Sequence, residues 1–374
     1  MRLDIWQHGT NRALNEVAFI VQQESDKPVP PEQNYIQIEP LGRTNVAYRW
    51  AGEADLFESL ASVQQRYRID PKRIVLRGFS MGGASTWHLG LHHPGRWAAI
   101  ESGAGFTETR NYGHRETLPP YQEAMLHYYD AADYSLNAFN APTVGYGGED
   151  DAQLRASVNI REQLAKEGMR FTQDGPFRWV SNDLRAIFLV GPKTGHSWHP
   201  DSRAESNAFI NKALETADEV PDRVRFVTYT ARFNRAHWLT VDALDRTHER
   251  ADVDARRSPD GKHAHRHDEE REPADGRVRH HIHDRRSGAR RAALSGPPGD
   301  VRKPTAPGRS RKASRLACAR STDCRGRWTM RSWTRLCACV RPERRGMRLP
   351  TTGPARPCPC SRRTSRSGCA ATCA

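Results

Sequence analysis

Apolar residues follow two alternating patterns along the first 217 residues. Short runs rich in β-branched and aromatic residues predict strands, and apolar residues spaced three or four apart predict helices. The predicted strands lie at 3–6, 35–38, 74–76, 97–100, 141–146 and 186–190, and the predicted helices at 14–21, 53–67, 84–91, 152–167 and 208–214. Since strands alternate with helices, we expect an α/β fold with a mostly parallel sheet covered by helices on both faces.

The pattern is interrupted once inside this region. Residues 107–140 are irregular and rich in Tyr, Pro and His. This segment is expected to form either a cap over a functional site or an excursion on the surface.

The strand at 74–76 runs directly into Gly78-Phe79-Ser80-Met81-Gly82, and a helical pattern follows at once. A strand, a tight Gly-x-Ser-x-Gly turn and a helix together are the context of a nucleophile elbow, which exposes the serine hydroxyl. Ser80 is therefore the predicted nucleophile. The main-chain amide of Met81 is the predicted oxyanion donor, because it follows the nucleophile directly.

An acid and a base follow at the ends of the next two strands. The chain order Ser, Asp, His is that of the α/β-hydrolase triad. Asp150 and Asp151 are both candidates for the acid, and Asp151 could instead simply cap the following helix. His196 is favoured as the base over His199, because it follows a glycine at the mouth of the strand loop. Four other histidines are expected to be structural or surface residues: His8, His88, His92 and His93.

A second oxyanion donor is expected upstream of the elbow. The strand at 3–6 runs into His8-Gly9-Thr10, and many serine hydrolases present this donor from a backbone amide just past such a glycine. Thr10 is the predicted residue, although His-Gly by itself is also what an ordinary turn would show.

Three motifs together resemble the prolyl-oligopeptidase-like serine hydrolases (peptidase S9) of the α/β-hydrolase fold. They are the elbow run at 74–83, the loop Gly148-Glu149-Asp150-Asp151 and the loop Gly191-Pro192-Lys193-Thr194-Gly195-His196. The resemblance covers roughly residues 3–215. It implies nucleophile Ser80, acid Asp151 and base His196, and it implies no metal or organic cofactor.

The resemblance also suggests how the chain is divided. Residues 1–217 would form the hydrolase domain, without the family's first two strands, because the first strand here corresponds to the third of the family's sheet. The runs at 225–230 and 234–238 look like the start of a small β domain that follows the hydrolase in some bacterial members. We therefore expect a partial β domain at 218–256.

Residues 257–374 are of a different kind. They hold 29 Lys/Arg against 10 Asp/Glu, so the net charge of +14 conceals a basic tail of +19 and a front part of −5. All eight cysteines lie between Cys318 and Cys373. Arg, Pro, Ser, Gly and Cys without periodicity predict disorder, and a frameshift is the favoured origin of the tail. Nucleic-acid binding by basic residues and metal binding by the histidines at 263–267 or the cysteine pairs at 337–339 and 358–360 are the weaker alternatives.

The sequence thus predicts a serine hydrolase that cleaves a peptide or carboxylic-ester bond. Its partner would be a small peptide or ester substrate, and no nucleic-acid partner is expected. No membrane association is expected either, since no stretch approaches the ~18–20 apolar residues that span a bilayer. The alternatives are a carboxylesterase of the feruloyl or acetyl-xylan type and an inactive, truncated gene product. No signal peptide is expected, because Met1 is followed almost directly by a strand. The localisation stays unknown, since a cysteine-free catalytic region fits either cytoplasm or export.

Overall fold

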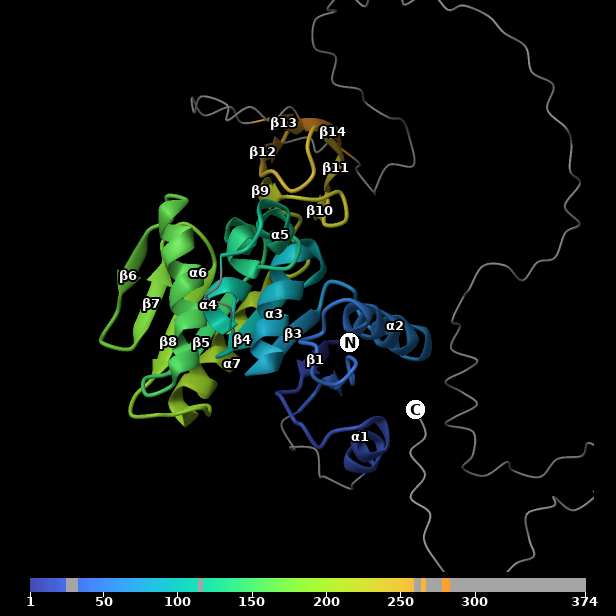
Figure 1. Cartoon of the computed structure of the whole chain (residues 1–374), viewed down its shortest axis with the longest axis vertical. Helices are drawn as coiled ribbons and strands as arrows, with labels where there is room; N and C mark the ends of the chain where they lie inside the picture. The colour runs from blue at the N-terminus through green and yellow to red at the C-terminus, as the bar shows by residue number, and fades with distance from the viewer. Residues whose placement is uncertain (25–32, 114–116, 259–263, 267–277, 283–374) are drawn as a thin grey trace, which may run out of the picture. The chain divides into compact units, whose positions relative to one another are not determined.

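The fold is built on one eight-stranded sheet (Figure 1). The computed structural model describes residues 1–24, 33–113, 117–258, 264–266 and 278–282, all within one compact unit, Met1–Pro298. The strand order is β2-β1-β3-β4-β5-β8-β7-β6. The first six strands of that order run parallel to one another. Strand β7 is antiparallel to β8, and β6 is antiparallel to β7. The predicted mostly parallel sheet is thereby confirmed.

The strands of the sheet are β1 (Leu3–Gln7), β2 (Ile36–Ile38), β3 (Ile74–Phe79), β4 (Ala99–Gly103), β5 (Thr143–Gly148), β6 (Phe171–Gln173), β7 (Arg178–Ser181) and β8 (Ala186–Gly191). The helices are α1 (Glu16–Gln23), α2 (Ala51–Arg66), α3 (Met81–His92), α4 (Thr109–Gly113), α5 (Pro120–Leu126), α6 (Arg155–Lys166) and α7 (Pro200–Glu215), with 3₁₀ turns η1 (Pro94–Arg96), η2 (Ala131–Asn140) and η3 (Ala152–Leu154).

Side chains of the central strands enter two separate cores, one on each face of the sheet. Leu76 packs with residues of α2, α3 and α6, whereas its neighbour Val75 packs with Ile210 and Leu214 of α7. This alternation follows from the two-residue repeat of a strand. Because both faces are buried, β3 is apolar almost throughout, as expected for a parallel strand covered on both sides. None of the described helices is long and apolar enough to cross a membrane.

Several elements differ from the sequence prediction. The antiparallel pair β6–β7 was not predicted, because its strands are only three and four residues long and none of their residues is fully buried. Strand β4 begins at Ala99 rather than at residue 97. The helix predicted at 14–21 exists, but α1 buries none of its residues, and Val17 and Val21 are 71% and 62% exposed.

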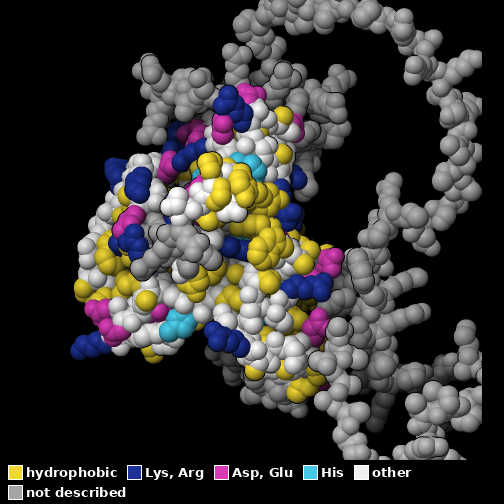
Figure 2. Space-filling model, in the orientation of Figure 1, with side chains coloured by type: hydrophobic (Ala, Val, Ile, Leu, Met, Phe, Trp, Pro, Cys, Tyr) yellow, Lys and Arg dark blue, Asp and Glu magenta, His cyan; other side chains and the backbone are white. Residues whose placement is uncertain are grey.

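The segment at 107–140 contains α4, α5 and η2. The 3₁₀ turn η2 is largely buried, whereas α5 buries none of its residues. Tyr121 and Met125 of α5 are 66% and 58% exposed. Figure 2 shows apolar side chains gathered at the surface in this region. The segment therefore has one buried part and one exposed apolar part.

A small β domain follows the sheet. It has two three-stranded sheets, β10-β11-β14 and β13-β12-β9. Its strands are β9 (Arg223–Thr228), β10 (Arg235–Ala236), β11 (Leu239–Leu244), β12 (Ala251–Arg257), β13 (Ala264–Arg266) and β14 (Val278–Ile282). Val224, Phe226, Leu239, Val241 and Val253 form its own buried core.

The end of this domain corrects one boundary. The sequence analysis ended the domain at residue 256 and expected disorder from 257, but β13 pairs with β12 and β14 pairs with β11 beyond that point. The domain is therefore longer than predicted. Strands β13 and β14 were not predicted because their sequences are rich in basic and histidine residues and lack the apolar alternation that is typical of strands. The predicted disorder of 259–263, 267–277 and 283–374, the cysteine pairs and both ends of the histidine run, His263 and His267, lie outside the described residues.

Candidate active site

Ser80 occupies the turn between β3 and α3 in a backbone conformation that residues with side chains rarely adopt. Its φ and ψ are 61° and −122°, a region whose occupation costs about 1–3 kcal/mol. The surrounding main chain holds it there: the Ser80 amide donates to the Gly103 carbonyl at 2.8 Å, and the Ser80 carbonyl accepts from the Ala84 amide at 3.0 Å. The strained turn leaves Ser80 partly exposed between two buried elements, which is the geometry of a nucleophile elbow.

Glycines let the loop after β1 lie against this turn. A Cβ atom on Gly82 would overlap the main-chain carbonyl of Gln7. A Cβ atom on Gly9 would lie 3.4 Å from the Cβ and 3.8 Å from the Oγ of Ser80. The loop that contains Thr10, the predicted second oxyanion donor, thus begins beside the serine hydroxyl.

The amide of Met81 is the other predicted oxyanion donor. Met81 is the first residue of α3, and its side chain is buried. An amide in the first turn of a helix has no acceptor within the helix. It is also favoured by the helix dipole for contact with negative charge. The position therefore suits the predicted role, which stays a prediction.

The structure brings His196 and Asp151 together. His196 Nδ1 lies 2.7 Å from Asp151 Oδ2. Because a carboxylate only accepts hydrogen bonds, Nδ1 carries the proton and Nε2 is left to act as a base. The Asp151 side chain is 6% exposed and that of His196 is 42% exposed. The ring of Phe79, the residue before Ser80, lies 4.9 Å from the His196 ring, centroid to centroid.

Asp151 also caps the turn that follows it. Its Oδ1 accepts from the Gln153 amide at 2.9 Å, while Oδ2 contacts His196. The capping interpretation and the catalytic interpretation are therefore compatible, since the two oxygens serve different partners. Gln153 in turn accepts from the amide of Gly105 through Oε1 at 2.9 Å, which connects the acid to the loop after β4.

The competing candidates lie elsewhere. Asp150 is exposed, and its amide donates to the Thr194 carbonyl at 3.0 Å. The amide of His199 donates to the Tyr146 hydroxyl at 2.8 Å, and its buried Nδ1 has no hydrogen-bond partner among the described residues. Only His196 of these two histidines contacts a carboxylate among the described side chains, which favours the pair Asp151 and His196.

A buried tyrosine fixes the loop beside Ser80. The Tyr48 hydroxyl donates to the Pro40 carbonyl at 2.6 Å and accepts from the His8 amide at 3.2 Å. Its side chain is fully buried, and burial raises the pKa of this phenol, which therefore stays protonated. Asn45 adds two contacts, with the amide and the carbonyl of Asn11, each at 3.0 Å. The segment between β2 and α2 thus holds the loop of residues 8–11 in place.

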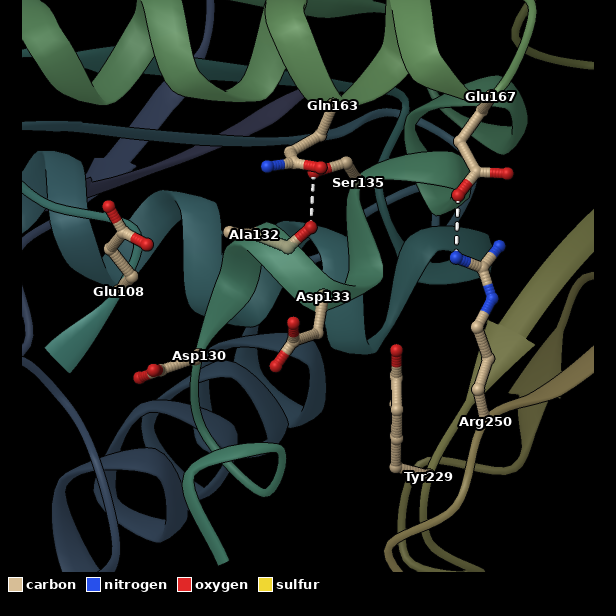
Figure 3. Close-up of a pocket in the computed structure, with 9 residues that line it drawn as sticks. All are labelled: Glu108, Asp130, Ala132, Asp133, Ser135, Gln163, Glu167, Tyr229 and Arg250. Carbon is tan, nitrogen blue, oxygen red and sulfur yellow. Dashed lines mark hydrogen bonds and ion pairs between the residues drawn. The ribbon is translucent and has the colours of Figure 1, made fainter. Parts of the chain in front are cut away.

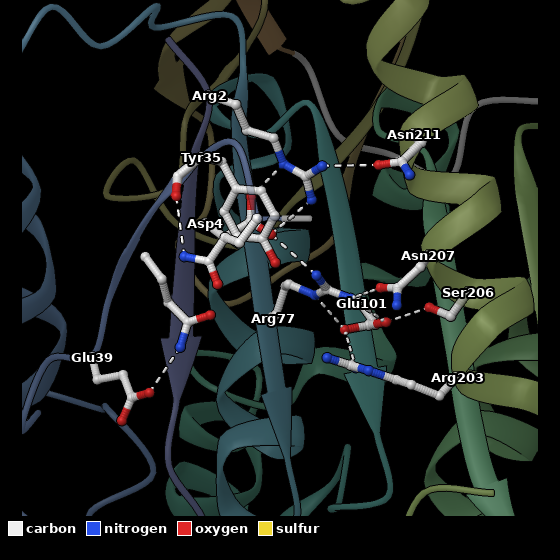
Figure 4. A network of polar contacts seen from close by, with 12 residues as sticks. Arg2, Asp4, Tyr35, Glu39, Arg77, Glu101, Arg203, Ser206, Asn207 and Asn211 are labelled. Atoms are coloured by element: carbon white, nitrogen blue, oxygen red, sulfur yellow. Dashed lines mark hydrogen bonds and ion pairs between the residues drawn. The ribbon is translucent and has the colours of Figure 1, made fainter. Parts of the chain in front are cut away.

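A buried charge network surrounds Arg77, which precedes Ser80 on the same strand (Figure 4). Arg77 of β3 donates to Glu101 of β4 through Nε at 2.6 Å and Nη2 at 3.0 Å, and to Asp4 of β1 through Nη1 at 3.1 Å. Glu101 also accepts from Arg203 at 2.8 Å and from the Ser206 hydroxyl. Burial alone would raise the pKa of Glu101, but Arg77 and Arg203 lower it to about 2. Sequence reasoning passed over this network, although a charged residue in an apolar strand was a visible signal.

The three histidines of the α3 region lie in the interior. His88 and His92 are almost fully buried, and burial lowers the pKa of both, that of His88 to about 4. His93 contacts Glu53 of α2 through Nε2 at 2.9 Å. These rings pack with Phe233 of the β domain, so they hold elements together. In the part of the chain that the structure describes, no group of three or more His, Cys, Asp or Glu is arranged to hold a metal ion.

Residues 48–141 match the prolyl oligopeptidase family. The resemblance to that family is confirmed for this segment. A curated Escherichia coli (strain K12) protein with the provisional name carboxymethylenebutenolidase is 28% identical over 156 residues, which are 41% of this chain and 47% of that protein. The chain thus spans about half the length of the curated relatives it matches.

Solved structures with a similar fold include the following two. One is TT1662 from Thermus thermophilus, with 17% identity, a TM-score of 0.38, and coverage of 57% of this chain and 89% of that one. The other is a puromycin-hydrolysing peptidase of Mycobacterium tuberculosis, with 15% identity, a TM-score of 0.39, and coverage of 57% and 34%.

Proposed function

We propose that this chain is a serine hydrolase that cleaves a carboxylic-ester or peptide bond through Ser80, His196 and Asp151. The observation that carries the proposal is the 2.7 Å contact between His196 Nδ1 and Asp151. It fixes the tautomer that leaves Nε2 basic, on a ring that lies against Phe79, the neighbour of Ser80. The prolyl oligopeptidase match over 48–141, which includes the elbow, supports the same conclusion.

The reaction follows from these roles. His196 Nε2 takes the proton of the Ser80 hydroxyl as Oγ forms a bond to the substrate carbonyl carbon. The oxygen of that carbonyl becomes negative and would be stabilised by the amides of Met81 and Thr10. His196 then gives its proton to the leaving alcohol or amine, and the bond to that group breaks. Water attacks the acyl-enzyme by the same route and releases the acid.

The test is covalent labelling of the full chain with a fluorophosphonate probe, which reacts with activated serine hydroxyls. We expect labelling of the parent protein and none of Ser80→Ala. Ser59→Ala on α2 is the matched control and should label like the parent. A folded parent protein that does not label, or a Ser80→Ala variant that labels equally, would refute the proposal.

The bond that is cleaved needs a second assay. Hydrolysis of p-nitrophenyl esters should be compared with hydrolysis of peptide p-nitroanilides, each in the parent protein and in Ser80→Ala. Turnover of esters alone would assign a carboxylesterase, and turnover of anilides would assign a peptidase. The same triad can perform both reactions, so substrate preference is decided by this measurement.

A further inference from the structure

Arg49, on the segment between β2 and α2, carries a partly buried charge with no carboxylate in contact. Its guanidinium carbon lies 5.2 Å from the centre of the Phe106 ring and 5.7 Å from that of the Tyr129 ring. Among the described residues this guanidinium forms neither a hydrogen bond nor an ion pair. The hydrolysis proposed above gives Arg49 no role.

Other arginines in the interior contact carboxylates. Arg77 and Arg203 contact Glu101 at 2.6 Å and 2.8 Å. Such pairing offsets the unfavourable free energy of burying a charge. Arg49 lacks this pairing, and burial lowers the pKa of its guanidinium, which nevertheless stays charged. An anion from outside the chain would supply the missing partner.

Asp130 attracts Arg49 without contacting it. The carboxylate oxygens of Asp130 accept instead from the amide and the hydroxyl of Thr109, at distances between 2.6 and 3.1 Å. The attraction therefore leaves the N–H donors of Arg49 open to a ligand.

The main chain around Arg49 is strained, which is an independent observation. Residues with side chains repeatedly adopt a positive φ here, in the left-handed region that favours glycine. They are Arg43 (58°), Thr44 (61°), Ala47 (50°), Tyr48 (52°) and Trp50 (51°). Trp50 has a ψ of −114°, so its conformation is close to the φ of 61° and ψ of −122° of Ser80. Such conformations cluster at functional sites, so this segment is shaped for more than a connection between β2 and α2.

Contacts on two sides connect Arg49 to the chain around Ser80. Phe106, whose ring faces the Arg49 guanidinium, follows Gly105 directly. A Cβ atom on Gly105 would lie 2.8 Å from the main-chain carbonyl oxygen of Ser80. On the other side, the hydroxyl of the residue before Arg49 accepts from the amide of His8, where the predicted oxyanion loop begins. Arg49 is thus held between the two loops that flank the nucleophile.

Aromatic rings extend the surface around this cation. Tyr112 stacks on Phe106 at 4.2 Å with an interplanar angle of 24°, and Trp50 meets Tyr129 edge-on at 5.7 Å. Trp50 and Tyr112 are 59% and 57% exposed. Exposed rings can pack against the carbon chain of a ligand, while a guanidinium fork matches the two oxygens of a carboxylate. The combination suits an organic acid.

We propose that Arg49 binds a carboxylate of the substrate, so that the enzyme acts on esters or amides that carry a carboxylate near the cleaved bond. This inference rests on the proposed serine hydrolysis and names its substrate class. The fork of Arg49 would donate two parallel N–H bonds to the carboxylate oxygens. The carboxylate belongs either to the acyl part or to the leaving group of the substrate, and the experiment distinguishes these two sources.

The first measurement compares kcat/KM of the full chain for an anionic and a neutral ester. The acyl pair is mono-p-nitrophenyl glutarate and p-nitrophenyl valerate, and the leaving-group pair is para-acetoxybenzoate and phenyl acetate. Ser80→Ala supplies the blank rate for each ester. We expect Arg49→Met to lower the preference for the anionic member of a pair roughly tenfold or more, because hydrogen bonds to a charged group are lost. The pair that responds identifies the part of the substrate that carries the carboxylate.

Arg68→Met is the matched control. Arg68 is exposed between α2 and β3, before the strand whose other end leads to Ser80. Its substitution removes the same charge and should leave the preference as in the parent. Thermal unfolding separates binding from structural support. Because Arg49 has no carboxylate in contact, Arg49→Met should unfold at the same temperature as the parent or at a higher one.

A binding measurement makes the site testable without the reaction. Isothermal titration calorimetry of Ser80→Ala should show saturable binding of monomethyl glutarate, weaker binding of the neutral dimethyl glutarate, and loss of the difference when Arg49→Met is added. Such binding in a parent protein that neither hydrolyses esters nor labels with fluorophosphonate would refute the proposed hydrolysis and keep the carboxylate site. Hydrolysis with an unchanged preference in Arg49→Met would refute the site and keep the reaction.

The inference is overturned if Arg49→Met changes the preference less than about twofold in both pairs, or if Arg68→Met changes it equally. It is also overturned if monomethyl glutarate binds Ser80→Ala no better than dimethyl glutarate does. If Arg49→Met does not fold, Arg49→Gln decides by the same measurements, because it also removes the charge and keeps a polar end on the side chain.

Discussion

Replacement of Glu101 by glutamine tests whether the buried charge network stabilises the strand that presents Ser80. Glu101 is fully buried and accepts from Arg77, Arg203 and Ser206. Glutamine has nearly the same shape, but its amide NH₂ would face guanidinium donors and its charge is gone. Arg2 and Arg77 would then share the single carboxylate of Asp4, and Arg203 would lose its carboxylate partner.

The magnitude follows from the pKa of Glu101. Its folded value of about 2 lies below the ordinary value of 4.5, which corresponds to about 3 kcal/mol of folding free energy at neutral pH. The sign is that of a lowered carboxyl pKa. The stabilisation is fully present above pH 4.5 and is lost as the pH falls from 4.5 toward 2. The parent protein should therefore lose more stability than Glu101→Gln over that interval.

Urea unfolding at pH 7 and at pH 3, followed by circular dichroism, measures this difference. We expect Glu101→Gln to be less stable than the parent by about 3 kcal/mol at pH 7 and by less than half of that at pH 3. Glu215→Gln, at an exposed position at the end of α7, should match the parent at both pH values. A difference below about 1 kcal/mol at pH 7, the range of an exposed ion pair, or a difference that does not shrink at pH 3, would refute the reasoning.

Three further predictions concern the candidate active site. Asp151→Asn should lower kcat for an ester substrate by roughly 10⁴-fold in steady-state kinetics, because an amide no longer fixes the imidazole tautomer. Asp150→Asn should change kcat little. A large loss in Asp150→Asn and a small one in Asp151→Asn would reassign the acid to Asp150. Gly82→Ala places a methyl group against a main-chain carbonyl of β1 and should abolish fluorophosphonate labelling; retained labelling would show that the contact gives way. Tyr48→Phe leaves a buried amide and carbonyl without their hydroxyl partner and should lower the unfolding free energy by about 1–3 kcal/mol; an unchanged urea midpoint would contradict this.

Local patterns determined how far the sequence could be interpreted. The elbow was predictable because one short segment contains the strand, the two glycines and the helix that define it. Asp151 and His196 were predictable as candidates because the ends of adjacent parallel strands meet at one edge of a sheet. The choice between Asp150 and Asp151 could not be made from local pattern, since both follow the same strand and only the fold shows which oxygen reaches the imidazole.

Features assembled from distant segments were not predictable. The residues that line a pocket beside η2 (Figure 3) are spread over more than one hundred positions, from Glu108 to Arg250, and no spacing connects them. The apolar spacing at 14–21 predicted a helix, which α1 confirms, but it could not show that Val17 and Val21 are exposed, because periodicity reports the form of a helix and not what covers it. The short strands β6 and β7 are too brief for alternation to identify.

The network around Arg77 also has a consequence for synthesis of the chain. Arg77 and its partner Asn207 are separated by 130 residues, and Arg203 and Ser206 of α7 are the partners of Glu101 from the same distant helix. At about 5–20 residues per second, β3 leaves the ribosome on the order of ten seconds before α7 does. During that interval Glu101 has Arg77 as a partner but not yet Arg203 or Ser206. The nucleophile strand can therefore reach its final buried state only after α7 has emerged, late in translation.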